Sequence, residues 1–235
     1  MRDQRLSPVG SDSPSISHVI FDLDGTLVDS CAVCIDILSE IITERGSVQS
    51  IDPIGARTYM SRGGLDMVSG LLGDACGDPA EDLAEFRARY QVRQTPVETL
   101  FPGVSDGLAR LRDAGLTLSI CSNKPQILCE KVLEDTGLAH HFTVVIGGQH
   151  GMRPKPAPDL LHAVLSHVDH PPEACLFVGD SELDHAVAVA ANIPFHFMTY
   201  GYAEPGWAPE QGVAFHCFQT MVNAILACTS TSTHA

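Results

Sequence analysis

Basic residues are scarce in this chain, and their scarcity excludes one broad class of function. The 235 residues include 14 lysines and arginines against 29 aspartates and glutamates, which gives a formal net charge of −15. Only three of the cations are lysines: Lys124, Lys131 and Lys155. A general nucleic-acid binder needs a basic stripe to meet the phosphates, and no such stripe is visible. We therefore expect no nucleic-acid partner.

Long apolar runs are also missing. No run approaches the roughly 20 residues that a helix needs to cross a bilayer. The N-terminal stretch MRDQRLSPVGSDSPSIS contains no apolar segment long enough for a secretory signal peptide. These two features predict a cytoplasmic protein with no membrane partner.

Cysteine is present, but without the spacing that metal sites use. The eight cysteines include one CxxC pair, Cys31 and Cys34, in the apolar helical stretch CAVCIDILSEII. Neither a second CxxC pair nor paired histidines lie near it, which disfavours a zinc site. We interpret these cysteines as core thiols of a reduced cytoplasmic protein.

The apolar residues gather in five short runs. Each is almost continuously apolar, as the strands of a parallel sheet covered on both faces are. The predicted strands are residues 18–22, 116–122, 142–147, 174–180 and 194–200. Helical patterns separate the last four of them, at 124–136, 157–168 and 182–191. This alternation predicts an α/β fold with a doubly wound parallel sheet.

One interval interrupts the alternation. Residues 31–99 contain no convincing strand and at least two helices, the second of which begins at Pro79 with acidic residues in its first turn. We predict a helical cap domain at 31–99, inserted into an α/β core domain made of 17–30 and 100–227. Residues 1–16 are predicted to be a flexible leader, and 228–235 a flexible tail.

Polar residues stand where the predicted strands end. In an open α/β sheet the carboxyl ends of the strands meet at one edge, where ligands bind. The residues that fall there are Asp22, Ser122, Asn123, Lys155, Asp180 and Asp184. Each has an ordinary alternative, such as a turn at Asp24-Gly25, a solvated charge at Lys155, or a helix N-cap at Asp180 or Ser181. Their joint placement favours a site.

The residue types at this edge suit phosphate chemistry. Several carboxylates with an apolar backing suit Mg²⁺, which binds carboxylates, waters and phosphate oxygens. An aspartate can act as a nucleophile and form an aspartyl phosphate while a second carboxyl group transfers the proton. A divalent cation and Lys155 would offset the charge of the crowded carboxylates. We therefore expect a Mg²⁺ cofactor and a small phosphorylated substrate.

Four segments carry a resemblance to a known family. They are FDLDGTLVDS, SICSNK, the lysine of RPKPAPD, and VGDSELDHAVAVAAN. Together they resemble the motifs of the haloacid dehalogenase-like (HAD) hydrolase superfamily, in particular its phosphoglycolate phosphatase-like branch. The resemblance covers about residues 17–205 and implies a Rossmann-like core with a small helical cap. The fourth segment ends in Asn192 where the family usually has glycine, and asparagine tolerates the left-handed conformation that glycine supplies.

The resemblance implies the roles of four side chains. Asp22 would be the nucleophile and a metal ligand. Asp24 would be the general acid and base, with its backbone carbonyl on the metal. Ser122 would hydrogen-bond the transferring phosphoryl group, and Lys155 would hold both this group and the nucleophile. The implied enzyme is a phosphoric monoester hydrolase.

The resemblance also implies the rest of the metal and phosphate site. Asp180 would complete the metal site, with Asp184 as a further ligand or a support. Residues Gly25, Thr26 and Asn123 would bind phosphoryl oxygens, as the backbone amides of turns can.

Differences from the motifs of other branches of the superfamily disfavour some of the reactions that those branches catalyse. Dehalogenating relatives lack the acid/base aspartate, and Asp24 is present here, which disfavours carbon–halogen cleavage. Phosphonoacetaldehyde hydrolases need a cap lysine to form a Schiff base, and residues 31–100 contain no lysine. Phosphomutases of the β-phosphoglucomutase type also use a cap lysine, so mutase activity is disfavoured but stays an alternative.

The cap is expected to select the substrate. Residues 55–73 resemble the specificity segment of phosphoglycolate phosphatases, and Arg62 beside Gly63-Gly64 is a candidate partner for a substrate carboxylate. Arg57 and Arg62 as plain surface charges are the alternative. The best substrate prediction is 2-phosphoglycolate, handled by a monomer or homodimer. A catalytically silent binding module remains the alternative from another class.

Overall fold

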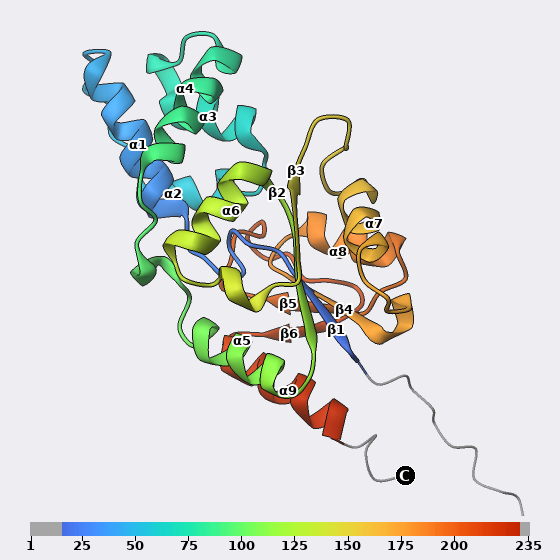
Figure 1. The fold of residues 1–235 in the computed structure, drawn as a ribbon. Helices are drawn as coiled ribbons and strands as arrows, with labels where there is room; N and C mark the ends of the chain where they lie inside the picture. The colour runs from blue at the N-terminus through green and yellow to red at the C-terminus, as the bar shows by residue number, and fades with distance from the viewer. Residues whose placement is uncertain (1–15, 231–235) are drawn as a thin grey trace, which may run out of the picture.

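The computed structural model describes residues 16–230, so residues 1–15 of the predicted leader and 231–235 of the predicted tail lie outside the described part. Its centre is a six-stranded sheet in which every neighbouring pair of strands is parallel, in the order β3-β2-β1-β4-β5-β6 (Figure 1). The strands are β1 (His18–Phe21), β2 (Thr117–Pro125), β3 (Val144–Gly148), β4 (Cys175–Gly179), β5 (Phe195–Met198) and β6 (Val213–Phe215). The predicted α/β doubly wound parallel sheet is confirmed.

Helices cover both faces of the sheet. They are α5 (Val104–Asp113), α6 (Gln126–Asp135), α7 (Asp159–Ser166), α8 (Glu182–Ala190) and α9 (Phe218–Ser230). Side chains of β1 alternate between two apolar clusters, because successive residues of a strand point to opposite faces. Phe21 packs with residues of α5, α6 and α9, whereas Ile20 packs with residues of α7 and α8. Both faces of the sheet are therefore covered by apolar side chains, as the apolar runs predicted.

The segment between β1 and β2 is helical in the described structure. It contains α1 (Cys31–Glu44), α2 (Pro53–Ala56), α3 (Gly64–Leu72) and α4 (Pro79–Val92), which Figure 1 shows grouped apart from the helices that flank the sheet. Asp78 caps α4 by accepting hydrogen bonds from the N–H groups of Ala80 and Glu81, and Pro79 occupies the first turn. We call residues 31–99 the cap; their boundary as a domain stays a prediction.

Short 3₁₀ turns complete the described structure. They are Arg57–Tyr59, Gly73–Ala75, Val97–Thr99, Ala139–His141 and Pro172–Ala174. Helix α9 runs through Ser230, so it takes in residues 228–230 of the predicted tail. Asn192 has φ 55°, the left-handed conformation predicted for it. Within residues 16–230, no helix has both the length and the apolar character needed to span a membrane.

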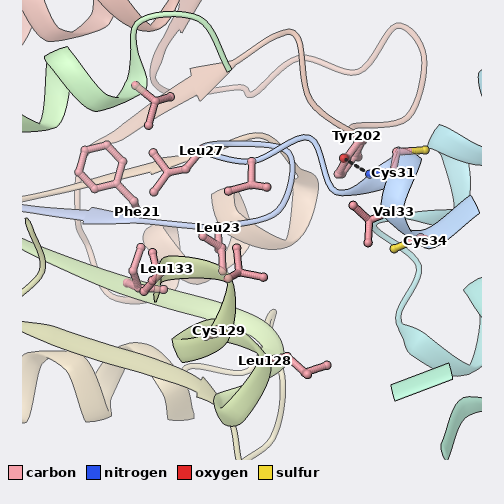
Figure 2. Packing of buried hydrophobic residues seen from close by; sticks show 14 of the residues in the cluster. Phe21, Leu23, Leu27, Cys31, Val33, Cys34, Leu128, Cys129, Leu133 and Tyr202 are labelled. Carbon is pink, nitrogen blue, oxygen red and sulfur yellow. Dashed lines mark hydrogen bonds between the residues drawn. The ribbon is translucent and has the colours of Figure 1, made fainter. Parts of the chain in front are cut away.

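The apolar packing extends from the sheet into the cap. Figure 2 shows Phe21, Leu23 and Leu27 followed by the CxxC cysteines at the start of α1, with Tyr202 beside them. Cys31 and Cys34 are buried, and burial raises the pKa of their thiols to about 11 and about 12. Both therefore stay protonated near neutral pH, and the interpretation as core thiols is confirmed.

Candidate active site

Three carboxylates meet at the carboxyl edge of the sheet. Asp22 follows β1, Asp180 follows the neighbouring β4, and Asp184 lies in the first turn of α8. One oxygen from each lies within 4.8 Å of the other two, and all three residues are buried. In the part of the chain that the structure describes, no other group of histidine, cysteine or acidic side chains has this compactness. The predicted convergence at the strand ends is present.

Lys155 joins this cluster from the loop after β3. Its ammonium donates hydrogen bonds to Asp22 Oδ1 at 2.7 Å, Asp184 Oδ1 at 2.6 Å and the Cys121 carbonyl at 2.9 Å. Asn123 fixes the backbone of the same loop: its side chain accepts from the Lys155 N–H at 2.7 Å and donates to the Lys155 carbonyl at 3.1 Å. Asn123 therefore positions Lys155 through its amide group.

The charges of this cluster do not balance. Burial and the neighbouring Asp184 raise the pKa of Asp22 to about 7, against the lowering effect of Lys155. Burial, Asp184 and Asp22 likewise raise the pKa of Asp180. Burial lowers the pKa of Lys155, but the carboxylates Asp184 and Asp22 raise it more. Three acids with one ammonium leave an excess of negative charge and bring several carboxylate oxygens together. Both features suit a hard divalent cation, which binds oxygen ligands and adds positive charge.

Asp180 is fixed on both oxygens. The Thr26 hydroxyl donates to Oδ1 and the Tyr202 N–H donates to Oδ2, each at 2.7 Å. Gly25, at φ 87°, lies so close that a Cβ there would overlap Asp180 Oδ2. The Gly25 N–H donates to the Val28 carbonyl. In this arrangement Gly25 and Thr26, predicted to bind phosphate, support the turn and Asp180.

Asp24 stands apart from the three carboxylates and has its own cation. Lys124 Nζ donates to its two oxygens at 3.0 and 3.1 Å. The same ammonium lies 4.3 Å from the ring centroid of Tyr90, on cap helix α4. Burial lowers the pKa of Lys124, but Asp24 raises it more, so Lys124 stays charged. Lys124 had no predicted role, although the scarcity of lysine in the chain was a signal for it.

A cavity of about 150 Å³ lies between this edge of the sheet and the cap. Asp22, Asp24, Ser122, Lys155 and Asp180 line it from the core. The cap side chains that line it include Met60, Met67, Leu83, Phe86 and Arg87. Its volume is well below the roughly 300–1,000 Å³ of drug-sized sites, so its ligand is small.

Arg62 is not among the residues that line the cavity. Its guanidinium pairs with Glu204 at 3.1 Å and lies 4.9 Å from the centroid of the Tyr59 ring. Arg57 pairs with Asp29 at 2.8 Å. The structure thus brings the predicted core residues together and places the predicted cap residue at an exposed contact.

The pattern of the haloacid dehalogenase-like hydrolase family matches residues 19–198. The chain belongs to this family. It is 34% identical over 212 residues to the phosphoglycolate phosphatase of Rhodobacter capsulatus, covering 86% of this chain and 94% of that protein. The plasmid-encoded phosphoglycolate phosphatase of Cupriavidus necator is 34% identical over 193 residues, covering 80% and 83%. The predicted superfamily, branch and phosphatase class are confirmed.

Solved structures share the fold. CbbY from Rhodobacter sphaeroides, determined in complex with phosphate, superposes with a TM-score of 0.72 at 22% identity, over 86% of this chain and 95% of that one. A haloacid dehalogenase-like family hydrolase from Streptococcus pneumoniae gives a TM-score of 0.73 at 23% identity, over 89% and 98%. The shared fold extends over the cap as well as the core, because these matches cover nearly the whole chain.

Proposed function

We propose that this protein is a Mg²⁺-dependent phosphatase that hydrolyses 2-phosphoglycolate through an aspartyl phosphate on Asp22. The observation that carries the proposal is the Lys155 ammonium, 2.7 Å from Asp22 within the three-carboxylate cluster, at the floor of a small cavity. The names of the relatives from Rhodobacter and Cupriavidus support the choice of substrate.

The metal would be held by the acidic cluster. Asp22, Asp180 and Asp184 supply carboxylate oxygens, and the backbone carbonyl of Asp24 is a further ligand in this proposal. When bound, Mg²⁺ offsets the negative charge that the carboxylates and the phosphate bring together. The hydroxyl of Thr26 and the N–H of Tyr202 fix the orientation of the Asp180 oxygens.

In the first step Asp22 attacks the phosphorus. A bond forms between Asp22 Oδ and phosphorus while the bond from phosphorus to the leaving oxygen breaks, and Asp24 gives a proton to that oxygen. Lys155 keeps the nucleophile oriented, and Ser122, buried in the second half of β2, hydrogen-bonds the transferring group. Catalysis is then mainly positioning and electrostatic stabilisation.

In the second step water releases the phosphate. Asp24 takes a proton from a water molecule, whose oxygen attacks the phosphorus of the aspartyl phosphate. The bond between phosphorus and Asp22 breaks, so the Asp22 carboxylate is restored and inorganic phosphate leaves. Lys124 holds the Asp24 carboxylate by two hydrogen bonds, which fixes the orientation of the group that takes this proton.

The carboxylate of the substrate needs a partner in the cap. Arg62 is one candidate from the sequence, and in this role it would have to leave Glu204 and turn into the cavity. Its ion pair with Glu204 is exposed on both sides, so the cost of this change is small, about 1 kcal/mol or less.

Phosphate release tests the proposal. The wild type and Asp22→Asn are assayed on a panel of phosphorylated metabolites, with Mg²⁺ and with a chelator. We expect release from 2-phosphoglycolate that needs both Mg²⁺ and Asp22. An isomerised sugar phosphate with little free phosphate would instead establish a mutase, and silence across the panel would contradict a phosphatase.

A further inference from the structure

Arg87 differs from every other lysine and arginine that the structure describes. The remaining arginines of the cap have carboxylate partners: Arg45 with Asp82, Arg57 with Asp29, Arg62 with Glu204, Arg89 with Glu44, and Arg93 with Glu40. The lysines and arginines described in the core are also hydrogen-bonded. Among the lysines and arginines within residues 16–230, Arg87 alone has a side chain with neither a hydrogen bond nor an ion pair, in a chain with a net charge of −15.

The unpaired guanidinium faces the cavity. Arg87 lies on α4, lines the cavity and lies beside Gly64 at the start of α3, where an added Cβ would be 3.5 Å from Nη2 of Arg87. Its neighbours on the same side, Leu83 and Phe86, are apolar and buried. Arg87 itself is exposed, so its guanidinium is accessible to a ligand in the cavity.

The other cations of the cavity are already neutralised. Lys155 is shared between Asp22 and Asp184, and Lys124 is held by Asp24. A substrate with a phosphate and a second anionic group would place the phosphate beside Asp22 and Lys155. Its second anionic group then needs a separate positive partner. Arg87 is the remaining cation among the residues that line the cavity.

We propose that Arg87 is a specificity-determining residue that binds the carboxylate of the leaving group, in place of Arg62. The proposal rests on the phosphatase function proposed above and names the part of the site that selects the substrate. The planar guanidinium can donate two parallel hydrogen bonds to a carboxylate. Arg62, by comparison, is outside the cavity and already paired with Glu204.

Binding separates this contact from catalysis. In an Asp22→Asn background, calorimetry with Mg²⁺ measures the dissociation constants of 2-phosphoglycolate and of ethyl phosphate, which has a methyl group in place of the carboxylate. Arg87→Ala should weaken 2-phosphoglycolate by about 10- to 100-fold, the loss expected for a charged hydrogen-bonded pair. Ethyl phosphate should change less than about twofold, and Arg87→Lys should keep part of the affinity.

Two further variants make the comparison decisive. Arg89→Ala, on the same helix but paired with Glu44 and Glu85, should leave both constants unchanged. A selective loss in Arg62→Ala and not in Arg87→Ala would overturn the assignment. So would equal weakening of both ligands by Arg87→Ala, or an Asp22→Asn background that does not prefer 2-phosphoglycolate.

Turnover of the wild type is measured separately, so that the two proposals can fail independently. An Arg87-dependent preference in binding without phosphate release would leave the carboxylate contact standing and remove the phosphatase proposal. Phosphate release from 2-phosphoglycolate, with no effect of Arg87→Ala on the ratio of kcat/KM for the two compounds, would have the reverse meaning. The phosphatase proposal would stand and the Arg87 contact would be removed.

Discussion

The two walls of the cavity are built on different principles. The core wall, formed by Asp22, Asp24, Ser122, Lys155 and Asp180, is polar and closely cross-linked by hydrogen bonds. The cap wall, which includes Met60, Met67, Leu83, Phe86 and Arg87, is mostly apolar and contains one unpaired cation. Lys155 is only 4% exposed, whereas Arg87 is exposed.

This difference separates the reaction from the choice of substrate. A core wall whose side chains are already bonded to one another is oriented before the substrate arrives, which is what electrostatic catalysis needs. A cap wall of apolar side chains with one free charge provides shape and a single point of recognition. Changes in the core wall should therefore abolish turnover or destabilise the fold, and changes in the cap should alter selectivity or do little.

The largest expected effect is that of Asp22→Asn. The substitution keeps the shape of the side chain but removes the nucleophile, so phosphate release should fall by at least about 1,000-fold. Circular dichroism and the thermal midpoint should show an intact fold. Activity above a few per cent of the wild type would mean that Asp22 does not form the intermediate.

Lys155→Met should have the largest effect on stability. The ammonium lies between two buried carboxylates, and its removal leaves their charges uncompensated at a cost of about 3–5 kcal/mol. Urea unfolding in the presence of a chelator measures this loss, and Mg²⁺ should recover part of it by binding the folded state. Lys131→Met is the matched control, because its pair with Asp135 on α6 is partly exposed and should contribute less than about 1 kcal/mol. Equal losses in the two variants would contradict the difference between buried and exposed pairs.

Acid should destabilise the core through His18. Burial, assisted by the charge of His170, lowers its pKa from 6.5 to about 4, so His18 is neutral in the folded protein. As the pH falls below 6.5, the unfolded chain takes up a proton that the folded chain does not. Between pH 7.5 and 5 this lowers the free energy of unfolding by about 2 kcal/mol, and the loss is complete near pH 4.

His18→Gln isolates this contribution. Urea unfolding at pH 7.5 and pH 5 should show a smaller pH-dependent loss in the variant than in the wild type, by about 2 kcal/mol. His162→Gln, at an exposed position of α7, is the control and should follow the wild type. A His18→Gln curve parallel to the wild type would place the acid sensitivity elsewhere, with His196, whose pKa burial also lowers to about 4, as the next residue to test.

The core wall could be predicted from the sequence because topology alone determines it. Five apolar runs gave five of the strands, and residues that follow neighbouring parallel strands must meet at one edge, as Asp22 and Asp180 do. Strand β6 was missed because its three residues, Val213–Phe215, make an apolar run too short to indicate a strand. Helix α3 was not resolved within the cap for a similar reason, since its glycines interrupt the helical pattern.

The cap wall could not be predicted in the same way. Whether Arg62 or Arg87 faces the cavity depends on how α3 and α4 pack over the edge of the sheet, and sequence spacing carries no information about this contact. Lys124 and Asp24 are 100 residues apart in the chain, so their pairing also depends on long-range packing. The motifs thus identify the reacting groups, whereas the arginine expected from the sequence, Arg62, lies outside the cavity that Arg87 lines.

The smallest effect is expected at Arg62. Its pair with Glu204 joins the cap to the core, but both side chains are about half exposed, at 43% and 51%. Arg62→Ala should therefore change the free energy of unfolding by less than about 1 kcal/mol, because solvent screens the pair and holding two long side chains costs entropy. Urea unfolding of Arg62→Ala, Glu204→Ala and the double variant measures the coupling directly. A coupling above about 1 kcal/mol would show that this exposed contact fixes the cap against the core, and the cap wall would then be as preorganised as the core wall.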